Sequence, residues 1–326
     1  MMNKIFGKLT NILVMLLVIA GCSKSEKNKV TVSETSSSEK AEPKNIEKTK
    51  PKLEKLVFAF QKQKDPAKVK ESADKVSKVL SEALGLPVDV MIPASYGASV
   101  QAMVSNKAQI AYLSSIPFLL AKSEAPVKPL LVELRKDQTF YDSVFVVKAD
   151  SEFKNLSDLK GKRMMFTSPT STSGYVMAYS RLVNDKLLKP AEDPASFFSS
   201  VNFAGGYDRA LLAVANGQAD VCAVSDYTMS GPKADLYLPA EKRKNLRILS
   251  KTSGVPTHLV AIRSDLDPEL QAKIKEALLK ISSEQKELIT DVYGAAKLVE
   301  VDEEKHLAGA VAALKNTGLE KKKLVK

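Results

Sequence analysis

Short apolar runs alternate with amphipathic stretches along most of the chain, beginning at Leu53. Runs of strand length occur at residues 56–60, 88–92, 110–113, 130–134, 144–147, 163–166, 201–203, 221–224, 246–249 and 259–262. Helical spacing of apolar residues, or cap residues that begin helices, predicts helices at residues 66–84, 98–106, 116–122, 174–188, 208–216, 268–281 and 303–315. Strands that alternate with helices are typical of an α/β fold with mostly parallel sheets flanked by helices.

The N-terminal pattern is different, because two lysines precede the nine apolar residues Ile12–Ala20. As a helix this run would rise about 14 Å, whereas a bilayer core is about 30 Å thick, so it fits the apolar region of a secretory signal peptide. Residues 19–22 read Ile-Ala-Gly-Cys and resemble the bacterial lipobox. The resemblance implies a lipoprotein signal peptide at residues 1–21 and a lipid-bearing Cys22, with palmitate among its acyl chains. A signal anchor with an incidental cysteine is the alternative.

Residues 22–52 are rich in Ser, Lys, Glu and Pro and contain no aromatic residue. Such a segment cannot bury enough apolar surface to offset the entropy lost on ordering. We therefore expect a flexible tether between the Cys22 anchor and the folded part. Its eight lysines are mixed with five glutamates, whereas a nucleic-acid-binding arm would be purely basic.

Composition narrows the classes of function. The formal charge is +11, but part of the excess lies in the signal peptide and the tether, which favours mild attraction of small anions and no nucleic-acid partner. Two His and two Cys exclude a disulfide framework, a four-cysteine zinc site and a His-rich metal site, and we expect no metal or cofactor. Cys222 lies in an apolar run and is expected to be a buried strand residue.

A hydroxyl-rich loop is the most informative stretch of the chain. Six of the seven residues at 167–173 are Ser or Thr, between a predicted strand and a predicted helix. Unpaired backbone N–H groups and a partial positive charge at a helix N-terminus bind anions, and hydroxyls beside them add neutral donors. N-capping within a polar loop would explain only one of these hydroxyls. The loop lacks the spacing of a phosphate-binding P-loop.

A glycine loop follows the next predicted strand. Gly205 and Gly206 precede Tyr207 and Asp208, and a helix is expected from Asp208 onward. Tyr207 would project into a cleft if this turn carries part of a site. A glycine turn capped by Asp208 is the equally simple alternative.

Four segments occur in an order that resembles the phosphonate, phosphite and phosphate binding proteins of bacterial ABC importers. They are YGASVQAMVSNKAQIAYL at residues 96–113, STSGY at 171–175, GYD at 206–208 with ANGQAD at 215–220, and VAIRSDL at 260–266. The resemblance covers residues 56–281. It implies a two-lobed type II periplasmic-binding-protein fold, with a ligand cleft between lobes and hinges near residues 141–147 and 255–260. Lobe 1 would comprise residues 53–139 and 255–326, and lobe 2 residues 140–254.

The resemblance also implies a set of ligand-binding residues. They are Tyr96, Ser114, Ser115, Tyr141, Ser171, Thr172, Ser173, Tyr207, Asp208, Asp226 and His258. Tyr207 replaces a histidine that many members carry, His258 replaces an aspartate of aminophosphonate binders, and Ser114-Ser115 replaces a Gly-Pro pattern. The first two changes favour a small phosphorus oxyanion over an aminoalkylphosphonate. For His258, an ordinary buried or surface histidine is the alternative.

The resulting prediction is a solute-binding lipoprotein without catalytic activity. It would lie outside the cytoplasm, anchored to a bilayer through Cys22, and would present a phosphonate, phosphite or phosphate to an ABC permease and its ATPase. Three alternatives remain: a sensory lipoprotein of the same fold, a binder of another small anion, and an extracytoplasmic hydrolase. The hydrolase is disfavoured because the sequence has no GxSxG elbow and no HExxH motif.

Overall fold

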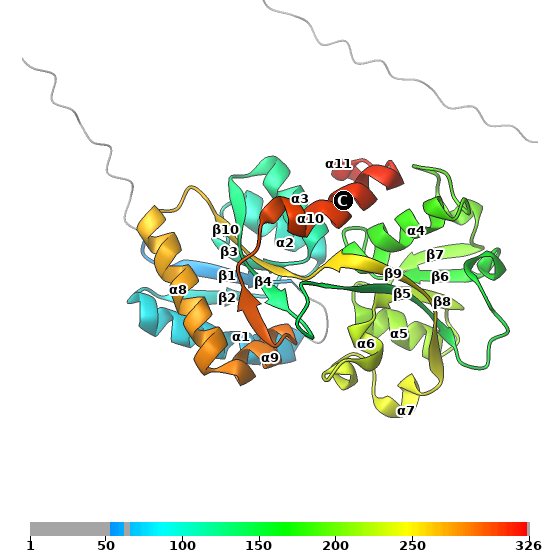
Figure 1. Cartoon of the computed structure of the whole chain (residues 1–326), viewed down its shortest axis with the longest axis horizontal. Coiled ribbons are helices and arrows are strands. Elements are labelled where there is room, and N and C mark those ends of the chain that lie inside the picture. Colours follow the sequence, from blue (N-terminus) through cyan, green and yellow to red (C-terminus); the bar gives the residue numbers. More distant parts are fainter. Residues whose placement is uncertain (1–52, 62–65, 325–326) are drawn as a thin grey trace, which may run out of the picture. The chain divides into compact units, whose positions relative to one another are not determined.

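The computed structural model describes residues 53–61 and 66–324, which form two β-sheets flanked by helices (Figure 1). The signal peptide, Cys22 and the tether lie outside the described residues. Within the described ranges, none of the helices is both long and apolar enough to cross a membrane.

The first sheet has six strands in the order β11-β4-β10-β3-β1-β2. The strands are β1 (Leu56–Phe60), β2 (Val88–Met91), β3 (Ile110–Leu113), β4 (Val127–Leu134), β10 (Leu259–Arg263) and β11 (Lys297–Val299). The helices are α1 (Pro66–Leu84), α2 (Tyr96–Val104), α3 (Ser115–Glu124), α8 (Pro268–Glu284) and α9 (Lys286–Tyr293). Because side chains alternate along a strand, Phe58 packs in the core with α1, α8 and α9, whereas Ala59 packs in the core with α2 and α3 (Figure 1).

The second sheet has five strands in the order β7-β6-β8-β5-β9. The strands are β5 (Phe140–Lys148), β6 (Arg163–Phe166), β7 (Ser200–Phe203), β8 (Val221–Ser225) and β9 (Leu246–Pro256). The helical segments are η1 (Leu156–Leu159), η2 (Thr172–Met177), α4 (Ala178–Asn184), η3 (Pro194–Ser196), α5 (Tyr207–Ala215), α6 (Tyr227–Ser230), η4 (Ala234–Leu236) and α7 (Ala240–Arg243). Cys222 is a fully buried free cysteine in β8, and burial raises the pKa of its thiol.

The α/β architecture is confirmed, but both sheets are mixed and not mostly parallel. Strands β2, β1 and β3 are parallel, as are β7, β6 and β8, whereas β10 is antiparallel to β3 and β4. Strand β5 is likewise antiparallel to β8 and β9. The antiparallel strands β4, β5, β9 and β10 are the ones that carry the chain from one sheet to the other. No helical crossover is needed at these connections, because neighbouring antiparallel strands can be joined without one.

Two crossings, β4 to β5 and β9 to β10, connect the sheets and are hydrogen-bonded side by side. The hydroxyl of Thr257 donates to the backbone oxygens of Glu133 at 2.7 Å and Thr139 at 3.0 Å. The amide of Glu133 in turn donates to the backbone oxygen of His258 at 3.0 Å. Residues next to the crossings therefore lie close to both sheets.

The C-terminal helix α10 (Glu303–Thr317), which precedes α11 (Lys321–Leu324), contacts elements of both sheets. It packs against η2, α4 and β9 and also against α3. The Asn316 side-chain amide donates to the Ser180 hydroxyl in α4 at 2.9 Å. Helix α10 therefore connects elements of the first and the second sheet.

The helix expected at residues 174–188 is not continuous. A π-helical turn, η2, comes first, and α4 ends at Asn184. Gly174 permits this turn, because a Cβ atom there would lie 2.2 Å from the hydroxyl oxygen of Thr167. Wide turns of this kind are frequent at functional sites.

Candidate ligand-binding site

A cluster of hydroxyl groups lies at the carboxyl ends of the parallel strands β6 and β8. The hydroxyl of Ser173 lies 2.8 Å from that of Ser225 and 2.9 Å from that of Tyr207. All three residues are fully buried. Ser143 in β5 positions this cluster by donating from its hydroxyl to the backbone oxygen of Ser173 at 2.7 Å.

The first turns of α3 and η2 meet beside this cluster. The amide of Ile116 in α3 donates to the hydroxyl oxygen of Thr172 in η2 at 2.9 Å. The hydroxyl oxygen of Ser171 accepts from the amide of Gly174 at 3.1 Å, which caps η2. Two helix starts with their positive ends close together favour an anion between them.

The two serines before and at the start of α3 have different roles. The hydroxyl of Ser114 accepts from the side-chain amide of Gln61 at 3.1 Å, so this serine is engaged within the first sheet. The hydroxyl of Ser115 lies 3.4 Å from the backbone oxygen of Pro256, where β9 ends. Gln61 is buried at the end of β1, and nothing in the sequence indicated its part in holding this loop.

Tyrosine side chains surround the hydroxyl cluster, and two of them have buried hydroxyls without a hydrogen-bond partner. These are Tyr96 at the start of α2 and Tyr141 in β5. The Tyr141 hydroxyl lies near Ser173 and Ser225, although burial outweighs these neighbours and raises the pKa of Tyr141 well above its usual value. A buried hydroxyl without a partner costs about 1–3 kcal/mol, so both are candidates for donating to a ligand.

The two predicted acidic site residues lie in different surroundings. Asp208 is at the start of α5, and its Oδ1 atom is buried without a hydrogen-bond partner. The carboxylate of Asp226, just after β8, accepts from the backbone amide of Asp142 at 3.3 Å, and burial raises its pKa. Asp226 is therefore partly engaged by the protein itself.

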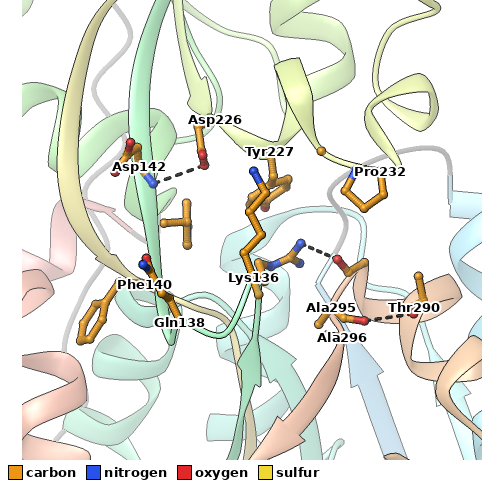
Figure 2. A pocket seen from close by; sticks show the side chains of 14 residues that line it. Lys136, Gln138, Phe140, Asp142, Asp226, Tyr227, Pro232, Thr290, Ala295 and Ala296 are labelled. Carbon is orange, nitrogen blue, oxygen red and sulfur yellow. Dashed lines mark hydrogen bonds between the residues drawn. The ribbon is translucent and has the colours of Figure 1, made fainter.

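A cavity of about 370 Å³ adjoins this part of the site (Figure 2). Its lining carries both signs of charge, from Arg135, Lys136, Asp142 and Asp226. Tyr141 also lines it, so the cavity lies next to the hydroxyl cluster.

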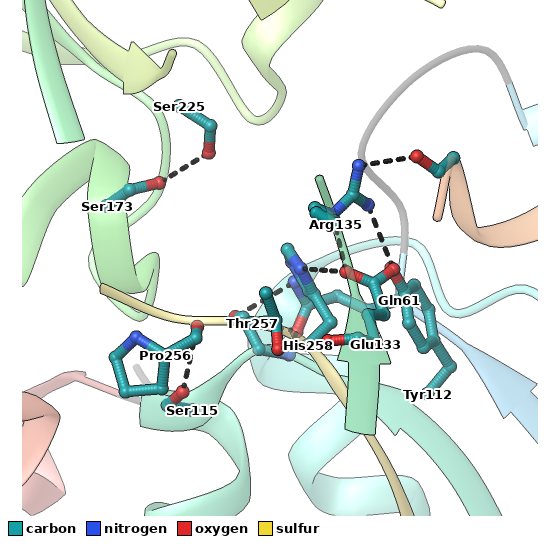
Figure 3. A network of polar contacts seen from close by, with 12 residues as sticks. Gln61, Tyr112, Ser115, Glu133, Arg135, Ser173, Ser225, Pro256, Thr257 and His258 are labelled. Carbon is teal, nitrogen blue, oxygen red and sulfur yellow. Dashed lines mark hydrogen bonds and ion pairs between the residues drawn. The ribbon is translucent and has the colours of Figure 1, made fainter. Parts of the chain in front are cut away.

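A buried polar network occupies the crossings between the sheets (Figure 3). We call it the crossing network and define it as Tyr112, Glu133, Arg135 and His258. The Arg135 guanidinium donates to both carboxylate oxygens of Glu133, at 2.8 and 2.9 Å, and the Tyr112 hydroxyl donates to the same carboxylate. Burial opposes ionisation of Glu133, but Arg135 and His258 outweigh it and hold its pKa at about 2.

His258 is the member of the crossing network that the sequence predicted. Its ring is fully buried, stacks near Tyr112 and Tyr141 at 5.2 and 6.0 Å between centroids, and places Nδ1 3.5 Å from Oε2 of Glu133. Sequence reasoning missed Glu133 and Arg135, because a charged pair inside an apolar strand and its adjoining turn has no motif of its own.

The chain matches a known protein family over most of its length. A family model described as ABC transporter, phosphonate, periplasmic substrate-binding protein matches residues 58–306. The chain belongs to this family.

Two relatives of the phosphonate-binding family are 28% identical to this chain. One is the phosphate-import protein PhnD of Mycolicibacterium smegmatis, over 64% of this chain and 65% of the relative. The other is the phosphonates-binding periplasmic protein of Escherichia coli, over 60% of this chain and 56% of the relative. The chain thus spans less than two thirds of the length of each relative.

Solved structures of the phosphonate-binding family show the same fold. PhnD1 of Prochlorococcus marinus, in complex with methylphosphonate, has a TM-score of 0.68 and 18% identity, covering 82% of this chain and 99% of that one. A binding component of an ABC phosphonate transporter from Pseudomonas aeruginosa has a TM-score of 0.68 and 22% identity, covering 82% and 96%. The fold is that of the type II periplasmic binding proteins.

The described part of this phosphonate-binding family member holds no group of three or more His, Cys, Asp or Glu side chains that could bind a metal ion. The chemistry of the site consists of hydroxyls, helix N-termini, one imidazole and two carboxylates. This donor set suits noncovalent recognition of an oxyanion.

Proposed function

We propose that this chain is the extracytoplasmic, lipid-anchored solute-binding component of an ABC importer and binds a phosphorus oxyanion between its two lobes without chemical turnover. The observation that carries the proposal is the hydroxyl cluster beside the first turns of α3 and η2. Ser173, Tyr207 and Ser225 are fully buried there, and Thr172 and Ile116 join the two helix starts beside them.

The physical case for an anion rests on the donors. Helix N-termini carry a partial positive charge, and hydroxyl groups donate hydrogen bonds without requiring a counter-charge. The buried hydroxyls of Tyr96 and Tyr141 have no hydrogen-bond partner, and an oxyanion between the lobes would accept from both. Because the Tyr96 and Tyr141 hydroxyls are buried, a hydrogen bond from either of them is stronger than it would be at the surface.

The ligand we propose is small: phosphite, phosphate or a short phosphonate. The predicted site residues Ser171, Thr172, Ser173 and Tyr207 are buried almost completely, which leaves little room for a long organic arm at the hydroxyl cluster. Relatives bear names that refer to phosphate, phosphonates and phosphite. The adjoining cavity near Asp226 would take a substituent, and an amino group there would meet a carboxylate already bonded to the Asp142 amide.

We further propose the two-lobe division and the anchor. Lobe 1 would be built on the six-stranded sheet and lobe 2 on residues 140–254 and the five-stranded sheet, with the two crossings as hinges. Closure by such a hinge would bring α3 against η2 and present the enclosed ligand to a permease. Acylation at Cys22 would hold the protein on the bilayer, since two or more acyl chains give stable anchoring.

Calorimetric titration of the purified chain with phosphite, phosphate, methylphosphonate, 2-aminoethylphosphonate and sulfate tests the ligand class. We expect saturable binding of at least one phosphorus compound, tighter than any binding of sulfate. Absence of binding by all four phosphorus compounds at millimolar concentration would refute the ligand class, and turnover of a phosphonate would refute the absence of catalysis. Tight binding of sulfate alone would support a binder of another small anion.

A further inference from the structure

Both ring nitrogens of His258 are buried without a hydrogen-bond partner among the described residues. Nδ1 lies 3.5 Å from the Glu133 carboxylate, whereas Nε2 forms no ion pair in this part of the chain. A buried polar atom without a hydrogen bond is costly, because its interaction with water is lost and not replaced. A bound ligand could supply the partner that Nε2 lacks.

The charges of the crossing network depend on His258. Arg135 and Glu133 form a two-pronged ion pair, so together they are neutral, and the same carboxylate lies 3.5 Å from Nδ1 of His258. A proton on the imidazole would leave the network with one excess positive charge at a buried position. That charge is costly to bury by itself and favourable when an anion lies beside it.

Groups from several elements surround the imidazole. Glu133 in β4, Tyr112 in β3 and Tyr141 in β5 lie against the ring itself. Two further titratable groups lie one contact away: Arg135 is paired with Glu133, and His306 in α10 lies beside the neighbouring Thr257. Burial raises the pKa values of Tyr112 and Tyr141 well above their usual range, so both rings are neutral at physiological pH. His306 lies 3.2 Å from the backbone oxygen of Thr257, and burial lowers its pKa.

We propose that Glu133 is a positioning residue that orients His258 and favours its protonated form, so that the anionic ligand and one proton bind together. Nε2–H of His258 donates a charge-assisted hydrogen bond to the ligand, and the proton comes from the solvent. Hydrogen bonds of this kind are about twice as strong as neutral ones. The inference rests on the proposed function, because the ligand that compensates the imidazolium is the phosphorus oxyanion.

A consequence follows for ligand selection. An imidazolium beside neutral hydroxyl donors stabilises a doubly charged oxyanion more than a singly charged one, since the Coulomb energy scales with ligand charge. The phosphate or phosphonate dianion is then the preferred form, and uptake of a proton by the protein accompanies its binding.

The chain contains only two histidines, which makes the experiment unambiguous. Titrations of the full chain in detergent with methylphosphonate, in two buffers of different ionisation enthalpy, measure the protons taken up per ligand at pH 6, 7 and 8. We expect His258→Gln to lower the uptake by up to one proton and to weaken binding about tenfold at pH 6, a change within the range for charge-assisted hydrogen bonds. The difference between His258→Gln and wild type cancels any proton exchanged by the ligand itself. His306→Gln is the matched control and should leave the proton count unchanged.

Glu133→Gln tests the positioning role. We expect it to reduce proton uptake in the wild-type background but not in the His258→Gln background, because its effect passes through the imidazole. If Glu133→Gln does not fold, His258→Gln compared with His306→Gln decides the outcome. A proton count and pH profile of His258→Gln equal to wild type, or a loss of affinity that is the same at every pH, would overturn the inference. Failure of wild type to bind any phosphorus oxyanion would instead overturn the proposed function.

Discussion

The hydrogen bond between Thr172 and Ile116 gives the most direct measure of how closure contributes to binding. Its atoms belong to η2 and α3, which are attached to different sheets, and the Thr172 side chain is fully buried. Thr172→Val replaces the hydroxyl by a methyl group of similar size. It removes the acceptor for the Ile116 amide and the donor that the hydroxyl offers to a ligand, while packing is nearly preserved.

The magnitude follows from the loss of both bonds. A buried amide left without an acceptor costs about 1–3 kcal/mol, and a hydrogen bond to a charged ligand contributes about 1.5–3 kcal/mol. The same bond is present in the ligand-free structure, so part of the first cost also falls on the ligand-free protein. We therefore expect affinity for the oxyanion to fall by about 1.5–3 kcal/mol, a factor of roughly 10 to 150.

The assay is calorimetric titration with methylphosphonate, together with urea unfolding of the ligand-free protein. Thr172→Ser keeps the hydroxyl and serves as the matched control, with affinity close to wild type. The bond joins elements attached to different sheets and contributes little within either sheet, so the free energy of unfolding should change by less than the free energy of binding. Unchanged affinity in Thr172→Val would refute this account of the site. An equally large fall in the free energy of unfolding and in the free energy of binding would also refute it.

Other parts of the molecule give three further predictions. Ser173→Ala removes the shared partner of Ser225 and Tyr207 and should weaken oxyanion binding by about 1–3 kcal/mol, which the same titration measures against Thr172→Ser. The pKa of Glu133 is about 2 in the folded protein and 4.5 ordinarily, so its contribution to stability is present above about pH 4.5 and is lost as the pH falls towards 2. Urea unfolding at pH 6 and pH 3 should therefore show a smaller pH dependence of stability in Glu133→Gln than in wild type. Cys22→Ala should move the protein from the membrane fraction to the soluble fraction, and its continued presence in the membrane fraction would contradict the lipid anchor.

Several elements were predictable because their signals are local. Strands β1, β3 and β6 have the bounds that the apolar runs indicated, and α1 spans the predicted residues 66–84. Burial on both faces of a central strand produces a continuous apolar run, and a helix start is decided by its first few residues. Such features depend on neighbours in the chain and can be interpreted without the fold.

The structure decided the features that depend on distant residues. Strand β9 extends to Pro256, well past the predicted Leu249, because it pairs along β5 through the crossing between the sheets. The π-helical start of η2 depends on the contact of Gly174 with Thr167, and the contacts of α10 with the second sheet depend on where the chain returns after β11.

The same contrast holds for the site. The sequence alone determined that hydroxyl residues gather before a helix and that Ser173 and Tyr207 follow two consecutive predicted strands. Only the tertiary structure decided that Ser225 completes the cluster, that Ser114 is held by Gln61, and that Glu133, paired with Arg135, lies beside His258. The physical reason is that capping and strand burial are encoded within a few residues, whereas a buried charge is tolerated only where distant segments supply its partner.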